Sequence, residues 1–151
     1  MCAGNLNLFS SRSFQMGGTS GEQIFEQDLD DTEGRVVQDL CNWLADNPDA
    51  QWEPSPRNKS VEQCPQKGLR HLLKPLESKH FKFYIFRTSH TGWKVHEEGK
   101  LIPIYPSEGC SIKDGDTSYP LRYGTKLHIS KQVTMEIANG NTVYLLWIIK
   151  R

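Results

Sequence analysis

Apolar residues in the first half of this chain recur at helical intervals. The first stripe consists of Val36, Val37, Leu40, Cys41 and Leu44. The second stripe consists of Leu69, Leu72, Leu73 and Leu76. Such spacing places the apolar side chains on one face of a helix, so the stripes predict one helix over about 32–46 and another from Pro65 to about Lys74. Residues 47–63 contain several prolines and are predicted to form a connector.

From His80 onward apolar and polar residues alternate, as they do on β-strands. Alternation is clearest where Val133, Met135 and Ile137 precede Asn139-Gly140 and the apolar run Val143 to Ile149. Asn-Gly favours the primed turn of a two-stranded hairpin, so the last two strands are predicted to form such a hairpin. Pro103 lacks a backbone donor, and it therefore predicts an edge strand or a bulge.

Together these elements predict an α+β protein. We expect two N-terminal helices followed by a mainly antiparallel sheet, or a small sandwich, of six to seven short strands. The chain is expected to divide into a mobile arm of acidic and polar residues at 1–31, a helix with a proline-rich connector at 32–63, and a compact α+β domain at 64–151.

Charge is distributed unevenly although the formal net charge is zero. Residues 1–50 carry nine acidic and two basic side chains, whereas residues 51–151 carry nine acidic and sixteen basic ones. An asymmetry of this kind affects which charged partners and tails attract one another, and it says little about the fold. Two roles are open for the acidic arm: it covers the basic region, or it serves as an extended tether.

The sequence contains no familiar catalytic or metal-binding motif. GxSxG, HExxH and a glycine-rich phosphate loop are absent. Cys64, His71 and His80 could hold a metal only as a scattered set, since structural zinc sites usually show two close ligand pairs. We therefore expect no metal and no cofactor. A site assembled from residues far apart in sequence would escape this kind of search, because such sites are recognised by geometry.

By elimination, the expected function is that of a non-catalytic interaction domain. It would bind a protein or peptide partner through an exposed strand edge near Pro103 or through an aromatic-basic face. Large aromatic residues and arginine supply most of the binding energy at such surfaces. The residues expected there are Trp93, Tyr105, Tyr119, Arg122 and Tyr123. Burial of these same side chains in the core is the alternative.

Two other functions stay open. The segment 57–100 holds ten basic and four acidic residues interleaved with aromatic ones, a composition that fits a nucleic-acid-binding domain. The basic residues expected to contact nucleic acid are Lys79, Lys82, Arg87 and Lys94. The remaining alternative is an enzyme with a site assembled from distant residues.

Membrane and compartment expectations follow from the apolar runs and the cysteines. No run approaches the roughly eighteen apolar residues of a membrane helix, so no membrane contact is expected. The cysteines Cys2, Cys41, Cys64 and Cys110 show no CxxC spacing, and no apolar signal-like segment opens the chain. We expect reduced thiols and an intracellular, cytoplasmic protein of unspecified oligomeric state.

Overall fold

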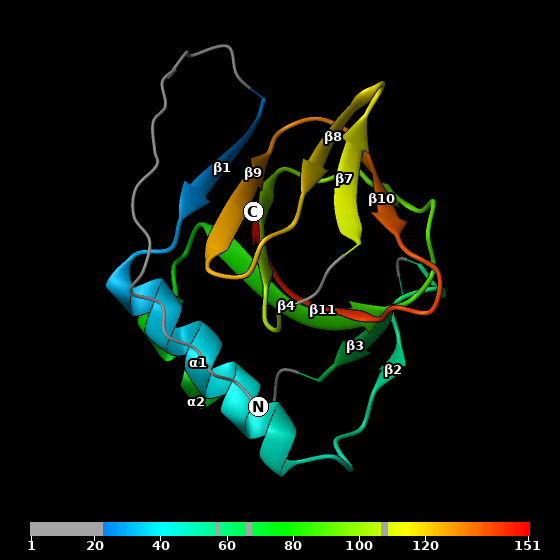
Figure 1. The fold of residues 1–151 in the computed structure, drawn as a ribbon. Helices are drawn as coiled ribbons and strands as arrows, with labels where there is room; N and C mark the ends of the chain where they lie inside the picture. Colours follow the sequence, from blue (N-terminus) through cyan, green and yellow to red (C-terminus); the bar gives the residue numbers. More distant parts are fainter. Residues whose placement is uncertain (1–22, 57, 66–67, 107–108) are drawn as a thin grey trace.

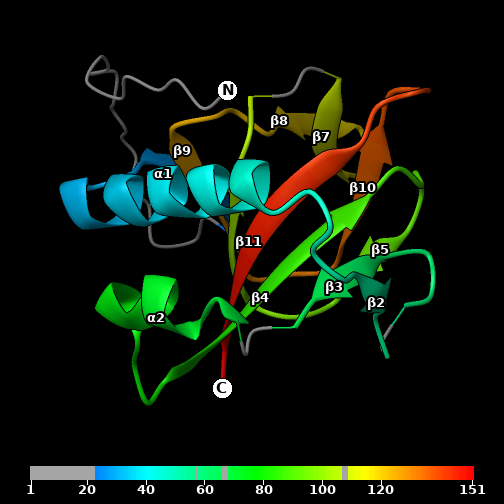
Figure 2. The ribbon, with the colours of Figure 1, turned by 90° about the horizontal axis from the view of Figure 1, so that it is seen from below.

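The computed structural model describes residues 23–56, 58–65, 68–106 and 109–151. Within these residues, eleven β-strands form two antiparallel sheets that face each other (Figure 1). Helices α1 (Asp31–Asp46) and α2 (Arg70–Leu73) lie on the outer face of the larger sheet, away from the smaller one (Figure 2). The fold therefore has three layers: helices, a large sheet and a small sheet.

The two sheets exchange strands along the chain. In spatial order, the larger sheet consists of β1 (Ile24–Asp28), β9 (Thr125–Ile129), β6 (Gly99–Pro103), β11 (Val143–Lys150), β4 (Phe81–Thr88), β3 (Glu62–Cys64) and β2 (Glu53–Pro54). The smaller sheet consists of β5 (Lys94–Val95), β10 (Val133–Ile137), β7 (Cys110–Asp114) and β8 (Thr117–Pro120). From β4 to β11 the chain crosses repeatedly between the sheets, which winds it into a closed sandwich.

Strand β11 shows why the large sheet has two apolar faces. Its residues Val143, Leu145, Trp147 and Ile149 belong to the core between the sheets. Leu146 and Ile148 alternate with them and belong to the core beneath the helices. Because side chains alternate across a strand, a strand covered on both sides must be apolar throughout. The prediction that this segment is covered on both faces is confirmed.

The first predicted helix is present and begins with a capping box. The Oδ1 atom of Asp30 accepts a hydrogen bond from the Glu33 amide at 2.8 Å, and the Asp30 amide donates to Glu33 Oε1 at 3.0 Å. These bonds satisfy amides that a helix start leaves without partners. The second helix is shorter than predicted, since α2 begins at Arg70 and continues only as a 3-10 turn, η2 (Lys74–Leu76).

The predicted α+β fold class is wrong. The chain is largely β: β1 precedes α1, and β2 and β3 lie between the helices, so two N-terminal helices do not lead into a single sheet. The missed strands are short, and β2 and β3 carry the polar residues Glu53 and Glu62 rather than an alternating apolar pattern. Pairing with β4, rather than local pattern, holds β3 in the sheet.

The predicted terminal hairpin is also wrong. Asn139-Gly140 does form a turn, with Gly140 at a φ of 86°, but β10 and β11 belong to different sheets. Strand β10 pairs with β5 and β7, whereas β11 pairs with β4 and β6. The turn therefore carries the chain from the small sheet to the large sheet. Pairing of β10 with β5 and β7, and of β11 with β4 and β6, places the two strands in different sheets.

Pro103 ends a strand that is otherwise central. Strand β6 lies between β9 and β11, but its pairing with β9 stops at Leu101. The amide of Ile104 donates to the carbonyl oxygen of Tyr144 in β11, so the nitrogen of Pro103 faces the side that β9 has left. The missing amide donor therefore costs no hydrogen bond between strands, and the expected edge strand lacks a neighbour on this side only after Leu101.

Three further expectations can be compared with the structure. Residues 24–28 of the expected arm form β1, which pairs with β9, while residues 1–22 lie outside the described residues.

Cys64 and Cys110 are free and buried, but Cys41 is disulfide-bonded, so the expectation of reduced thiols is wrong for Cys41. Among the described residues, no helix is both long and apolar enough to span a membrane.

Candidate functional site

A cavity of about 770 Å³ opens between the two sheets. We call it the inter-sheet cavity. Its lining comes from four segments that are distant in sequence: residues around the β2–β3 turn, the inward face of β4, the segment around β5, and the inward face of β11. The residues that the following argument uses are Phe86, Trp93, Lys94, His96, Glu97 and Trp147.

Three aromatic rings form one wall of the cavity. Phe86 of β4 is contacted edge-to-face by Trp93, with ring centroids 5.9 Å apart, and by Trp147 of β11, with centroids 5.6 Å apart. Strands β4 and β11 pair antiparallel with Phe86 opposite Leu145, and both residues point inward. The alternation of each strand thus brings the rings together, and the wall is large, rigid and apolar.

Ionisable side chains lie at the rim of the cavity. Val95 of β5 is fully buried and pairs with Val133 of β10, which fixes this segment to the small sheet. The neighbouring Lys94 and His96 are exposed, and Glu97 is half-buried. A base, an imidazole and a carboxylate therefore meet at the mouth of an apolar cavity.

Two hydrogen-bond donors in the cavity wall have no acceptor. The indole Nε1 atoms of Trp93 and Trp147 are buried and lack a hydrogen-bond partner among the residues that the structure describes. Nearly all buried polar groups in proteins are hydrogen-bonded to protein or to water. Both nitrogens are shielded from solvent, so they lie within the packed aromatic wall rather than opening onto the cavity.

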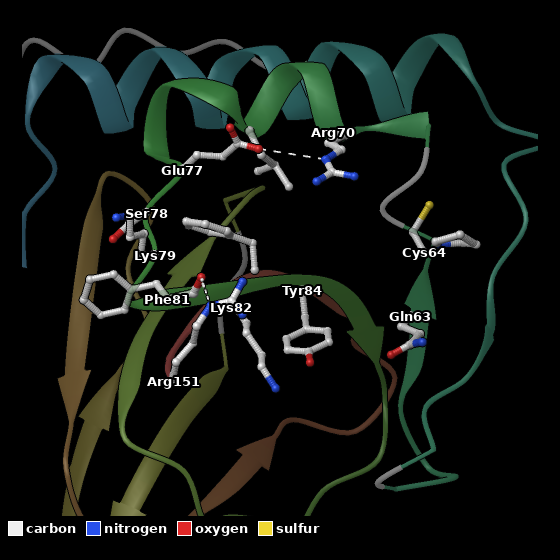
Figure 3. Close-up of a pocket in the computed structure, with 13 residues that line it drawn as sticks. Gln63, Cys64, Arg70, Glu77, Ser78, Lys79, Phe81, Lys82, Tyr84 and Arg151 are labelled. Atoms are coloured by element: carbon white, nitrogen blue, oxygen red, sulfur yellow. Dashed lines mark hydrogen bonds and ion pairs between the residues drawn. The ribbon is translucent and has the colours of Figure 1, made fainter.

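A second hollow lies beside α2 and has a volume of about 1040 Å³. Figure 3 shows α2 on one side of this groove and β4 on the other, with Arg70 and Glu77 facing each other on the α2 side. Their side chains are 81% and 48% exposed and 3.9 Å apart, so this ion pair adds little. The lining of the groove contains no histidine, and its carboxylate, Glu77, faces Arg70, so we regard the groove as the weaker candidate despite its size.

Cys64, in the wall of the same groove, is a poor nucleophile. Burial raises the pKa of its thiol; the nearby Arg87 charge opposes this shift and the Glu53 charge adds to it. A thiol with a raised pKa holds less of the reactive thiolate at neutral pH. The groove therefore offers no activated thiol at Cys64.

The five predicted partner-binding residues do not share a surface. Trp93 and Tyr119 pack against the core between the sheets, whereas Tyr105 and Tyr123 pack against the core beneath the helices. Arg122 is exposed, with its Nε 3.8 Å from Glu26 Oε2. The large sheet separates the two pairs of aromatic residues, so the structure brings only Trp93 into the inter-sheet cavity.

The four basic residues of the nucleic-acid alternative also lie in different places. Lys79 and Lys82 line the groove beside α2, and Lys94 lies at the cavity rim. Arg87 donates from Nε to Glu62 Oε1 at 2.7 Å and lies over the Trp52 ring. Arg87 is thus engaged with its own chain, and only Lys79 and Lys82 share a hollow.

Sequence reasoning missed Phe86, His96, Glu97 and Trp147 as site residues. The alternation of β11 could have shown that Trp147 shares a face with Leu145 and Ile149. It could not have shown that this face borders a cavity, because the rest of the lining comes from segments about 50 to 90 residues earlier in the chain.

The ligand set for a metal was also tested against the structure. Across residues 23–151, apart from the five positions that are not described, no three His, Cys, Asp or Glu side chains are grouped closely enough to hold a metal ion. Cys64 is buried in the groove wall, while His71 and His80 are exposed. The scattered set named from the sequence therefore does not converge.

Comparison with known proteins gives a match in fold only. No family model and no curated protein matches the sequence. The structure resembles the crystal structure of a Pseudomonas putida prolyl-4-hydroxylase, with a TM-score of 0.53 over 85% of this chain and 93% of that chain. The two sequences are 10% identical, so the likeness shows a shared fold, a double-stranded β-helix, and no more.

This match corrects the expected function. A non-catalytic interaction domain was inferred because no catalytic motif is visible, yet the chain shares its fold with a prolyl-4-hydroxylase and the aromatic residues chosen for docking do not form one surface. The alternative of an enzyme with a site assembled from distant residues agrees better with both findings. The chain is similar in fold to a prolyl-4-hydroxylase.

Proposed function

We propose that this protein is an enzyme whose active site is the inter-sheet cavity. The observation that supports this most directly is the convergence of four distant segments on one apolar cavity with Lys94, His96 and Glu97 at its rim. A large apolar pocket with a few convergent polar groups is the usual form of a small-molecule site. The fold shared with an enzyme adds support by analogy.

The reaction that suits these residues is proton transfer at a carbon next to a carbonyl group. His96 accepts the proton as the C–H bond breaks, and the electron pair moves to the carbonyl oxygen to give an enolate. Histidine is the side chain most often used for such transfers, and a second ionisable group, Glu97, lies beside it in sequence at the same rim. The aromatic wall holds the apolar part of the substrate.

We do not extend prolyl hydroxylation to this chain. Inserting oxygen into a C–H bond is chemistry that proteins carry out with a cofactor. Non-haem iron oxygenases hold their metal with two histidines and one carboxylate. The residues that the structure describes contain no such group of three, so they do not fit that metal. The proposal therefore uses only the chain's own side chains.

The test is hydrogen–deuterium exchange of the substrate. Purified full-length chain is incubated in deuterated buffer with aryl and alkyl ketones and with 2-oxo acids, and loss of the α-proton signal is followed by NMR. We expect at least one compound to exchange about a hundredfold faster than in buffer, and His96→Gln to abolish the acceleration. His90→Gln, which alters an exposed histidine outside the cavity lining, is the matched control.

Exchange at the buffer rate for every compound would contradict the proposed reaction. Equal acceleration by the His96→Gln chain and the unaltered chain would show that His96 is not the proton acceptor. Loss of acceleration in His90→Gln would show that the effect of His96→Gln is not specific to the cavity.

A cytoplasmic location also stays a proposal. The free thiols of Cys64 and Cys110 agree with a reducing compartment, whereas the disulfide at Cys41 does not, since disulfides are rare in the cytosol. Fractionation of cells that express the full-length chain checks it, and recovery in an oxidising compartment would overturn it.

A further inference from the structure

One edge of strand β4 faces the groove beside α2. Strand β4 pairs with β11 along its whole length, from Phe81 to Thr88. Its pairing with β3 on the other side covers only Ile85 to Arg87. Among the residues that the structure describes, the segment 81–84 therefore has a strand on one side only, and all four of its residues line the groove. We call this segment the β4 edge.

The backbone groups of Phe81 and Phe83 point toward the groove rather than toward β11. The amide of Arg151 donates to the carbonyl oxygen of His80 at 2.8 Å, in the register of the β4–β11 pair. Hydrogen-bonded and non-hydrogen-bonded pairs alternate along an antiparallel ladder, so Phe81 and Phe83 belong to the second kind. The Phe81 carbonyl accepts from Arg151 Nε at 3.1 Å. Among the described residues, the Phe83 amide and carbonyl have no strand partner, so they offer one donor and one acceptor to an added strand.

The side chains around the β4 edge differ between the two faces of the sheet. On the helix side, Phe83 and Leu73 belong to the core beneath the helices. On the opposite face, Lys82 is exposed and lies between Tyr84 and Arg151 in Figure 3. Because side chains alternate across each strand, an added strand would place every second side chain against apolar groups and the others beside cations.

The charge of the groove favours an acidic partner. Its lining includes one acidic side chain, Glu77, and four basic ones, which are Arg70, Lys79, Lys82 and Arg151. Lysines at a strand edge discourage pairing with a second copy of the chain, because the same cations would then face each other. For the same reason they favour a strand of opposite charge.

We propose that the β4 edge binds an extended peptide segment in which acidic and apolar residues alternate, so that the segment adds a strand to the large sheet. Main-chain hydrogen bonds at Phe83 supply affinity, and the alternate side chains supply specificity. The groove is a separate hollow from the inter-sheet cavity, although Gln63 and Tyr84 line both. The site therefore adds a binding partner to the proposed enzyme and does not depend on its reaction. It also differs from the edge near Pro103 that was expected from the sequence.

The probe is a blocked, fluorescein-labelled peptide of alternating glutamate and valine, and its binding to the full-length chain is followed by fluorescence anisotropy. A peptide of alternating lysine and valine tests the sign of the charge. A Glu–Val peptide with N-methylated backbone amides tests the hydrogen bonds, and an oligothymidylate of equal length presents negative charge without a strand. Labelling with ¹³C-carbonyl lysine and ¹⁵N-phenylalanine identifies the Phe83 amide in NMR spectra, because Lys82-Phe83 is the only Lys-Phe pair in the sequence.

We expect the Glu–Val peptide to bind at low salt and to slow hydrogen exchange of the Phe83 amide about tenfold or more at saturation. The Phe86 amide is the internal control, because the same alternation already pairs it with Leu145 of β11. Lys82→Glu should weaken binding about tenfold or more. Lys59→Glu changes the net charge equally at an exposed lysine outside the groove lining, and it should leave binding unchanged.

Several results would overturn this assignment. They are failure of the Glu–Val peptide to bind, and equal binding by the Lys–Val peptide or by oligothymidylate. Unchanged exchange at Phe83 in the bound state, or full affinity of the N-methylated peptide, would show that no strand is added. Protection of Phe83 that rises with protein concentration, without any peptide, would identify a second copy as the occupant instead. Hydrogen–deuterium exchange of the ketone and oxo-acid substrates bears only on the proposed reaction, so the two proposals can fail separately.

Discussion

Lys126 of β9 donates to both carboxylate oxygens of Glu33 in α1, with both Nζ–O distances 2.7 Å. Their side chains are only 10% and 8% exposed. The same Glu33 carboxylate accepts the Asp30 amide in the capping box, so one group both starts the helix and attaches it to the sheet. This contact links residues 93 positions apart, and it fixes how α1 lies across the outer face of the large sheet.

We expect Lys126→Met to lower the free energy of unfolding by about 3 kcal/mol. The substitution leaves the Glu33 carboxylate buried without its counter-charge, and removing one partner of a buried pair typically costs about 3–5 kcal/mol. Urea unfolding followed by circular dichroism measures the change.

Lys131→Met is the control for this pair. Lys131 lies 3.0 Å from Asp114, but both side chains are more exposed, so its loss should cost less than about 1 kcal/mol. Equal losses in the two variants would show that burial of the Glu33–Lys126 pair does not matter.

His128 makes stability fall as the solution becomes mildly acidic. Burial, followed by the charges of Lys100 and Lys126, lowers the pKa of His128 to about 4. In the unfolded chain its pKa is about 6.5, so protonation favours unfolding. The stability tied to neutral His128 is complete above about pH 6.5 and declines as the pH falls toward 4.

We expect the free energy of unfolding to drop between pH 7 and pH 5 by about 1 kcal/mol more in the unaltered chain than in His128→Gln, after allowance for solvent screening of this half-buried ring. Urea titrations at the two pH values give the difference. His90→Gln, at an exposed position, should retain the full drop. Identical drops in the His128→Gln and unaltered chains would rule His128 out as the source.

Gly99→Ala tests the closest approach of β6 to β11. An added Cβ at Gly99 would overlap the carbonyl oxygen of Ile148, which is backbone and cannot move aside. We expect a loss of about 3 kcal/mol in the free energy of unfolding. At Gly68 the nearest atom to an added Cβ, Cζ2 of Trp43, is 3.9 Å away, so Gly68→Ala should be nearly neutral. Thermal unfolding compares the two variants, and similar melting temperatures would contradict the close approach.

Cys110 should resist alkylation in the folded protein. Burial raises the pKa of its thiol to about 12, and its Sγ lies 3.8 Å from Met135 Sδ in the core. Since the thiolate is the reactive form, iodoacetamide at pH 8 should label Cys110 at least about a hundredfold more slowly than a free cysteine.

Cys64 provides the comparison for Cys110. It lines the groove beside α2, and although burial raises its pKa as well, we expect it to react first. Peptide mass spectrometry follows both sites. In urea the two rates should become equal, and rapid labelling of folded Cys110 would show that the core opens more readily than the structure indicates.

The local sequence pattern predicted those helices and strands that depend mainly on their own residues rather than on contacts with distant ones. The stripe from Val36 to Leu44 marks α1 in the sequence, and the Asp30–Glu33 capping box begins the helix. The apolar run of β11 likewise predicted a strand covered on both faces, because no other environment accommodates so many adjacent apolar side chains. Short, polar β2 and β3 have no such signal, since β3 is placed by pairing with β4 and β2 by pairing with β3.

The sequence by itself thus determined where α1 and the long strands lie and that β11 is buried on both sides, because propensity, capping and alternation act between near neighbours. Only the tertiary structure decided that Asn139-Gly140 crosses between sheets rather than closing a hairpin, and that Trp93, Phe86 and Trp147 meet around a cavity. Those contacts join residues dozens of positions apart. They depend on which strands pair, and pairing is settled by the whole fold rather than by any one segment.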